Sequence, residues 1–306
     1  MFCDKIKLFC AGTVIYACIL IEMSQMRSVL ILTDFSEAAF RAAEYACWLA
    51  DVLQIKRVVL YHAYEVVIAS TDTPMPPVKT NEELYLESME ALNMLRDRLR
   101  LNLPDMVAID MLAENTFLPE TINQRCKEQK IDLLVMGKTG KSGVDRLIAG
   151  SVTARMLEKS RYPLLMVPED TMIGKEIKTI VFTTDLKDTS SIPVTMLHSF
   201  LDAFKAEVKV VNAGPAVEEA YASGARKKAV DGLHKIMDKY SPSFFYVDGD
   251  NIVDSILTFS GQHHASLIIT ITKTHNFLSS IFHKSVSKRL AYNSPTPLLC
   301  LPEAGM

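Results

Sequence analysis

The sequence of 306 residues lacks the short motifs that mark most hydrolases, kinases and dinucleotide enzymes. It contains no G-x-S-x-G, no H-E-x-x-H and no kinase signature set, and no G-x-G-x-x-G follows its first predicted strand. Its six cysteines form no C-x-x-C pair, and its seven histidines show no zinc-like spacing with cysteine or acidic residues. We therefore predict no catalytic residue and disfavour a protein metal centre.

No charge of one sign dominates the chain. The formal net charge is -3 and the isoelectric point is about 6.2, which gives no general reason to bind nucleic acid or an anionic membrane. Hydrophobic residues make up 49% of the chain, as in ordinary globular proteins. Reduced thiols and a cytoplasmic location are the simplest interpretation of the cysteines.

No apolar run is long enough to cross a bilayer comfortably. Lys5 and Lys7 precede an uncharged stretch over 8–21, which resembles the core of a signal peptide but lacks a small-residue cleavage site. Three interpretations stay open for 1–26. These residues are an extension upstream of a natural start at Met23 or Met26, an anchor to a membrane or partner, or a secretory signal. Membrane association is the less favoured expectation.

A pattern of glycines directly follows an apolar segment at 133–136. Gly137, Gly140 and Gly150-Ser151 give the spacing G-x2-G-x9-G-[ST]. Glycine at the end of a strand lets the backbone approach a ligand, and the start of a helix favours an anion. Since we expect a helix to begin at Gly150-Ser151, the pattern predicts a phosphate-binding loop. A purely structural glycine turn is the alternative.

Two consecutive segments resemble the end of a Walker A loop but do not complete the motif. Gly137-Lys138-Thr139 and Gly140-Lys141-Ser142 would need glycine at 132 or 135, where Asp and Val stand. The cations of this region, Lys138, Lys141 and Arg146, either steer phosphates or are solvated loop residues.

The chain contains an internal repeat. Residues 162–169 return as 296–303 with five of eight positions identical, and Ser151-Val152 returns as Ser285-Val286 at the same offset of 134. Residues 29–34 correspond to 180–185 at an offset of 151. We therefore predict two tandem domains, 27–170 and 177–306, after the N-terminal extension 1–26.

Each half alternates predicted strands and helices, which is typical of a doubly wound α/β fold. Ser36 is placed to cap the first helix, whose apolar positions recur every three or four residues. The predicted strands are 28–33, 57–63, 106–112, 132–136 and 164–167, then 179–184, 207–213, 243–247, 266–271 and 298–301; the predicted helices of the first half are 36–53, 82–100, 117–129 and 151–159.

Several of these segments together resemble the universal stress protein family. They are Thr33-Asp34-Phe35-Ser36-Glu37, Tyr61-His62, Met136-Gly137 and the glycine pattern, and the chain is similar to a tandem member. The resemblance implies a five-stranded parallel sheet in the order 3-2-1-4-5 in each half. It also implies dimerisation through the last strand, here 164–167 and 298–301, and thus an internal pseudo-dimer. Further association into a homodimer stays open.

The resemblance implies binding of ATP or AMP, with Mg²⁺ or Mn²⁺ accompanying a triphosphate through ligands that the sequence does not identify. Asp34 would contact the nucleoside, the backbone of Ala63 would read the adenine edge, and the glycines would hold ribose and phosphates. Two alternatives concern single residues: Asp34 caps the following helix, and His62 is structural. The implied site residues are Thr33, Asp34, Ala63, Met136, Gly137, Gly140, Gly150, Ser151 and Val152.

The second half departs from the glycine pattern. Ile271, Thr274 and Lys284 stand where the first half has its three glycines, although Asp185 and Ser285 remain. β-Branched residues would be strained wherever positive φ is required. We therefore predict one nucleotide site, in the first half.

Three functions follow from these residues. The first is a regulatory or stress-response protein that binds an adenine nucleotide. The second is a slow ATP-hydrolysing enzyme. The third is a structural pseudo-dimer module without ligand, which the three glycines of the first half disfavour.

Overall fold

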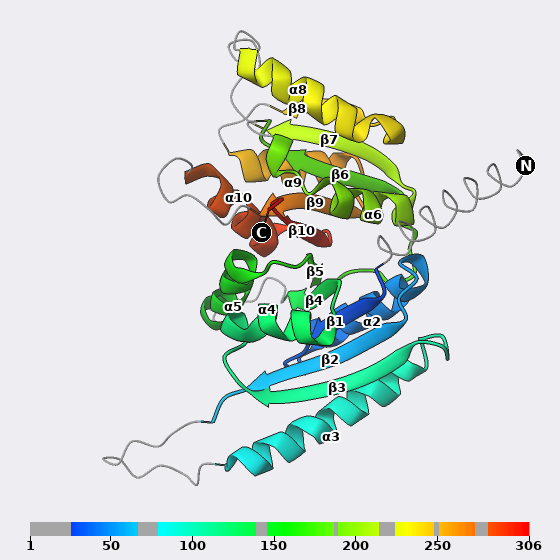
Figure 1. Cartoon of the computed structure of the whole chain (residues 1–306), viewed down its shortest axis with the longest axis vertical. Coiled ribbons are helices and arrows are strands. Elements are labelled where there is room, and N and C mark those ends of the chain that lie inside the picture. Colours follow the sequence, from blue (N-terminus) through cyan, green and yellow to red (C-terminus); the bar gives the residue numbers. More distant parts are fainter. Residues whose placement is uncertain are drawn as a thin grey trace, which may run out of the picture.

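A computed structural model describes residues 26–66, 79–138, 146–186, 189–213, 224–247, 251–272 and 281–305. Strands and helices alternate along both halves of the chain (Figure 1). The architecture is α/β and doubly wound, which confirms the predicted fold class.

The first half contains five strands and four helices within the described residues. Its first, fourth and fifth strands are mainly apolar runs because both faces of the sheet are covered there. The elements are β1 (Ser28–Leu32), α2 (Glu37–Val52), β2 (Arg57–Tyr64), α3 (Asn81–Arg100), β3 (Ala108–Asn115), α4 (Leu118–Gln129), β4 (Leu133–Lys138), α5 (Arg146–Lys159) and β5 (Leu164–Pro168).

The second half repeats this alternation with one main difference at its first helix, which is preceded by a short 3₁₀ turn. The elements are β6 (Thr179–Thr184), η1 (Thr189–Ser191), α6 (Val194–Phe204), β7 (Glu207–Ala213), α8 (Gly224–Met237), η2 (Asp238–Tyr240), β8 (Ser243–Val247), α9 (Ile252–Gln262), β9 (Leu267–Thr272), α10 (Ile281–Asn293) and β10 (Leu298–Pro302).

The ten strands form one continuous sheet in the order β3-β2-β1-β4-β5-β10-β9-β6-β7-β8. Within each half the strands are parallel, and the first half has the predicted order 3-2-1-4-5. The halves join where β5 and β10 run antiparallel, with Leu298 opposite Met166 and Cys300 opposite Leu164. The carboxyl ends of the strands therefore lie at opposite ends of the sheet in the two halves.

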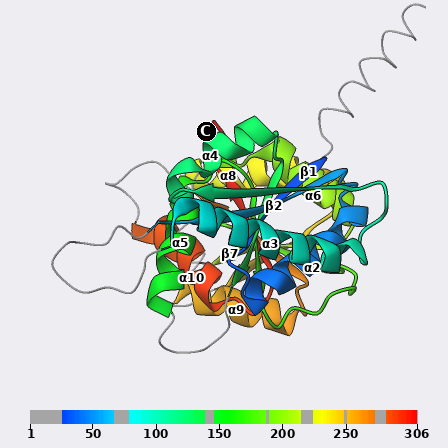
Figure 2. The ribbon, with the colours of Figure 1, turned by 90° about the horizontal axis from the view of Figure 1, so that it is seen from below.

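Helices cover both faces of the sheet (Figure 2). Each face has its own hydrophobic core. Side chains of α2, α3, α6 and α8 pack on one face, and side chains of α4, α5, α9 and α10 pack on the other. Successive residues of a strand alternate between these two cores. The face on which each site residue lies thus follows from its position in its strand.

Two predicted elements differ from the structure. The third strand covers Ala108–Asn115 rather than 106–112, because Val107 lies in a turn. Its amide bonds to the carbonyl of Pro104, and Arg100 donates to the carbonyl of Val107. The fourth helix begins at Arg146 rather than 151, since the helix-forming residues 147–149 extend it toward its N-terminus.

None of the helices in the described part of the chain is both long enough and apolar enough to span a membrane.

Candidate functional site

The turn after β1 is built from four consecutive residues. The amide of Phe35 donates to Thr33 Oγ1 at 3.0 Å, and Ser36 donates to Asp34 Oδ1 through its amide at 3.0 Å and its hydroxyl at 2.5 Å. Ser36 Oγ in turn accepts from the amide of Ala39 at 3.2 Å, so Ser36 caps α2 as predicted. Asp34 is exposed and fixes the cap, rather than capping the helix itself.

One oxygen of Asp34 remains available for a ligand. Oδ1 is used by Ser36, whereas Oδ2 accepts no hydrogen bond from the described residues. A carboxylate oxygen held in this way is suited to accept from a hydroxyl or amino group.

Phe35 and His62 form a pair that the sequence did not single out as a site. Phe35 has φ +63, an uncommon value for an aromatic residue, and its side chain is 39% exposed. Its ring lies 4.5 Å from that of His62, measured between centroids. His62 Nδ1 lies 2.8 Å from the carbonyl oxygen of Thr33. Because a carbonyl only accepts, Nδ1 carries the proton, and His62 has a structural role in holding the end of β1.

The backbone of Ala63 lies at an edge with which no strand of the described residues pairs. Pairing of β1 with β2 ends at Leu32 and Tyr61, and the amide of Thr33 takes the carbonyl of Tyr61 at 2.9 Å. Backbone groups of strand residues two apart point to the same side. The N–H and C=O of Ala63 therefore point to the same side as those of Tyr61, where β1 no longer runs alongside β2. On the other side β2 continues alongside β3 to Tyr64. A planar ligand with paired donor and acceptor atoms fits this edge.

Gly137 is required by the packing of α2 against β4. A Cβ at this position would lie 2.3 Å from the carbonyl oxygen of Ala38 and 2.6 Å from the amide nitrogen of Ala39. The buried face of α2 is rich in alanine, which lets the first turn of the helix come this close. The glycine therefore serves close approach and not positive φ, which corrects the reason expected for its replacement by Ile271.

The remaining glycines and Ser151 lie on or before α5. Gly140 lies outside the described residues. Because α5 begins at Arg146, Gly150 and Ser151 fall in its second turn and are not its first residues, contrary to the prediction. Arg146, which the sequence placed in the loop before this helix, is likewise helical.

Three predicted residues lie on the same face of the sheet. Ala63, Met136 and Val152 are partly buried against the core shared with α4 and α5. Gly137 contacts α2 on the opposite face. Ala63, Met136 and Gly137 thus lie near the carboxyl ends of β2 and β4, on either side of β1 and the turn that follows it.

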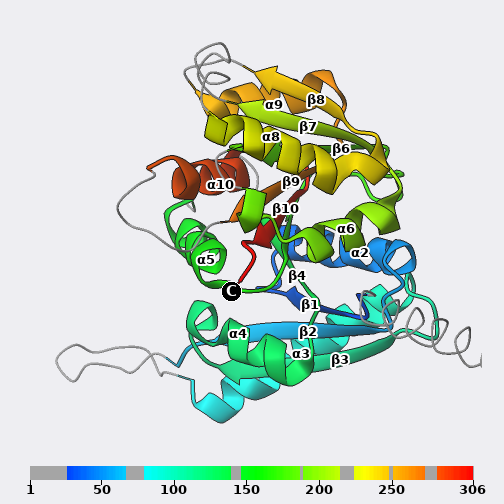
Figure 3. The same cartoon turned by 45° about the horizontal axis from the view of Figure 1, so that its top comes forward.

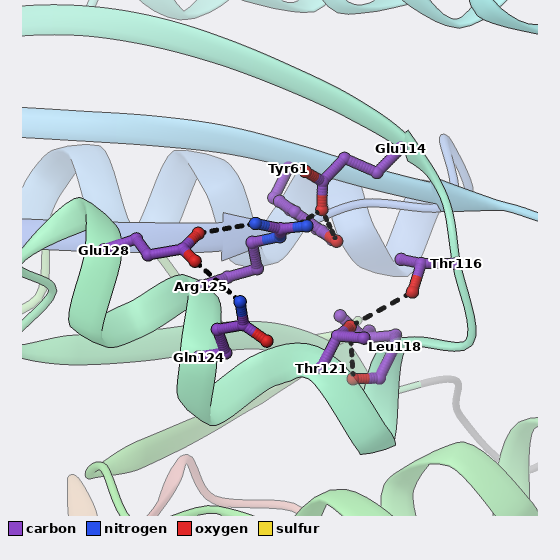
Figure 4. Close-up of polar contacts among 8 residues, drawn as sticks. All are labelled: Tyr61, Glu114, Thr116, Leu118, Thr121, Gln124, Arg125 and Glu128. Carbon is purple, nitrogen blue, oxygen red and sulfur yellow. Dashed lines mark hydrogen bonds and ion pairs between the residues drawn. The ribbon is translucent and has the colours of Figure 1, made fainter.

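A polar cluster between the strands and α4 links β2 and β3 to that helix (Figure 4). The buried hydroxyl of Tyr61 donates to Glu114 Oε2 at 2.7 Å, and Arg125 Nε donates to the same oxygen at 2.7 Å. Arg125 also pairs with Glu128. Burial, and then the hydrogen bond with Glu114, raise the pKa of Tyr61, so the hydroxyl stays protonated as a donor. The cluster joins β2, β3 and α4 next to Ala63.

The second half keeps the turn after its first strand, but the residue at the position of Phe35 is buried there. Leu186 has φ +51 and donates to Thr184 Oγ1 at 3.3 Å, and Asn212 donates to the carbonyl of Thr184 at 2.9 Å, as His62 does in the first half. Leu186, however, is only 3% exposed. The first helix, α6, begins at Val194, ten residues after β6 ends, whereas α2 begins five residues after β1. No side chain of the described residues caps α6.

Within the described ranges, no group of three or more histidine, cysteine, aspartate or glutamate residues is placed to hold a metal ion.

The fold and the strand-end geometry define a tandem doubly wound α/β protein with its candidate site in the first half. Residues 26–168 match the model of the universal stress protein family. Universal stress protein MJ0531 of Methanocaldococcus jannaschii is 28% identical over 145 residues, which cover 46% of this chain and 81% of that protein. The match identifies a universal stress protein domain in the first half of the chain, at residues 26–168.

Solved structures share the fold of the whole chain. A universal stress protein from Archaeoglobus fulgidus aligns with a TM-score of 0.67 and 14% identity, covering 91% of this chain and 99% of that chain. A functionally unknown protein, PA1789, from Pseudomonas aeruginosa aligns with a TM-score of 0.57 and 15% identity, covering 92% and 94%. Both relationships concern the fold alone.

Proposed function

We propose that the chain binds one adenine nucleotide, ATP or AMP, at the carboxyl end of the central strands of its first half, and that this binding regulates a stress response. The observation that carries the proposal is the open backbone edge of Ala63 beside the turn that holds Asp34. The edge is suited to an adenine ring and the free carboxylate oxygen of Asp34 to a nucleoside donor. The glycine pattern of the family supplies the phosphate side.

The site residues we propose are those that the resemblance implied, in a first domain over 27–170. In the second domain, 177–306, the equivalent turn is closed by the buried Leu186, and Ile271 stands at the position of Gly137. The two domains act as an internal pseudo-dimer joined through β5 and β10. A divalent cation accompanying the triphosphate would be held largely by the phosphate oxygens.

Isothermal titration calorimetry of the full chain with ATP and with AMP tests this proposal. We expect saturable binding with a stoichiometry near one per chain, and Asp34→Ala should weaken it about tenfold by removing a hydrogen bond to a charged group. Asp254→Ala, an exposed carboxylate in α9 of the second half, is the control and should leave affinity unchanged. A stoichiometry near two would refute the single site.

The slow ATP-hydrolysing enzyme remains the alternative. A phosphate-release assay with the same preparations separates the two functions. Steady turnover that is lost in Asp34→Ala would favour the enzyme, and binding without turnover favours the regulatory protein.

A further inference from the structure

Lys138, which follows Gly137 in the glycine pattern, reaches from the first half to the second. Its Nζ donates to the backbone carbonyl of Ser294 at 2.6 Å. Ser294 directly follows α10, and its amide bonds to the carbonyl of Leu290. Its carbonyl therefore lies at the C-terminal end of that helix, where the partial negative charge of the helix dipole favours a cation.

The positive charge of Lys138 is not neutralised by any residue in the described part of the chain. The side chain is half-buried, and burial lowers its pKa to about 8. No carboxylate of the described residues pairs with it, and the contact with Ser294 uses only one of its three N–H donors. A partly buried ammonium with free donors is costly to maintain and is stabilised by an anion.

The contact between Lys138 of the first half and Ser294 of the second half has no equivalent from the second half to the first among the described residues. At the offset of 134, Thr272 corresponds to Lys138 and Ser160 corresponds to Ser294. Thr272 Oγ1 donates to the carbonyl of Leu301, within its own half, at 3.2 Å. The half that lacks the glycine pattern therefore also lacks the lysine.

A second contact holds the same parts together. Glu158 of α5 forms an ion pair with Lys288 of α10, and the two helices lie side by side (Figure 3). The helix after the glycine pattern and the helix that presents Ser294 are thus fixed relative to each other.

We infer that the second half completes the first-half site by orienting Lys138 as a phosphate-binding residue. The Ser294 carbonyl positions the ammonium, and its remaining N–H donors bind phosphate oxygens of the nucleotide. This inference rests on the proposed function for the identity of the nucleotide. It gives the second half a role in binding although its own glycines are replaced.

Calorimetry on full-length variants tests the role of the ammonium, with ATP, adenosine and inorganic tripolyphosphate as probes. Lys138→Met should weaken ATP and tripolyphosphate binding about tenfold or more, the effect of losing a charge-assisted hydrogen bond, and adenosine binding less than about twofold. Lys159→Met removes an equal charge from α5, where Lys159 pairs with Glu120 inside the first half, and should change none of the three.

A pair of serine variants tests the contribution of the second half. Ser294 Oγ donates to the carbonyl of Thr296 at 2.7 Å and fixes the turn that presents the carbonyl. Ser160 makes the matching contact with Tyr162 at 2.8 Å, and both serines are buried. Ser294→Ala should therefore weaken ATP binding about threefold or more, while Ser160→Ala, with a similar loss of stability, should not.

The outcomes separate this inference from the adenine-nucleotide function. Tripolyphosphate binding that needs Lys138, without binding of ATP or adenosine, would support the inference and refute the adenine function. Normal ATP binding by Lys138→Met, or equal effects of the two serine variants, would overturn it. A wild-type chain that binds neither ATP nor tripolyphosphate would overturn both.

Discussion

At the scale of single residues, Gly137 shows that one glycine can be needed for packing as well as for a ligand. Its missing Cβ makes room for the first turn of α2, and that turn carries the cap held by Asp34. The sequence identified Gly137 as a loop glycine. The contact with Ala38 became apparent only in the structure, because the two residues are about a hundred positions apart in the chain.

Gly137→Ala should destabilise the protein by ~1–3 kcal/mol, because the added Cβ would clash with backbone atoms of α2 that cannot turn aside. Gly261→Ala is the matched control. Its Cβ would meet nothing within 4 Å in α9, and alanine favours a helix by up to about 1 kcal/mol. Urea unfolding followed by circular dichroism measures both, and equal stability of the two variants would contradict the packing role.

At the scale of elements, the first turn of α2 links helix stability to the site. Ser36 both caps the helix and donates to Asp34, so the residues that start α2 also aim the carboxylate. The cap was predictable because serine before an amphipathic run is a local signal. The start of α5 was not, since helix-forming residues 147–149 precede the glycine that was expected to begin it.

Ser36→Ala should cost ~1 kcal/mol of stability through the lost cap and weaken ATP binding about threefold, since Asp34 loses the hydroxyl donor and keeps only the backbone amide of position 36. Thr80→Ala removes the capping box of α3, in which Thr80 and Glu83 bond to each other's backbone, at a similar cost in stability. Thermal unfolding and calorimetry on both variants separate the effects. If Thr80→Ala weakens ATP binding as much as Ser36→Ala, the loss reflects stability alone.

At the scale of the whole molecule, two five-stranded sheets become one through β5 and β10. Each strand would otherwise be an edge with unpaired backbone groups. The pairing also places α10 against α5 and brings Ser294 to Lys138. The seam between the halves therefore determines what surrounds the glycine pattern.

Leu299→Asp should destabilise the protein by at least ~3 kcal/mol, because Leu299 lies opposite Leu165 in the seam, is 1% exposed, and would bury a carboxylate without a partner. Met172→Asp, at a side chain that is 64% exposed, should stay within about 0.5 kcal/mol of the wild type. Thermal unfolding with size-exclusion chromatography measures the difference. An unchanged midpoint for Leu299→Asp would contradict a tightly packed seam.

The sequence by itself determined the doubly wound class, the order of elements and the strand ends at which the site lies. Apolar runs, capping residues and the internal repeat are local or periodic signals, and they can be recognised without knowing which segments meet. The glycine pattern located Gly137, and the resemblance to universal stress proteins indicated Thr33 and Asp34. The domain boundaries at 170 and 177 remain predictions.

Only the tertiary structure decided which side chains and backbone groups are free to act. The open edge of Ala63 depends on where β1 stops pairing with β2, and the closure of the second half depends on the burial of Leu186. The position of Lys138 depends on a carbonyl 156 residues away in the chain. Such contacts join distant segments, and their geometry is set by how the two halves pack and not by any local pattern.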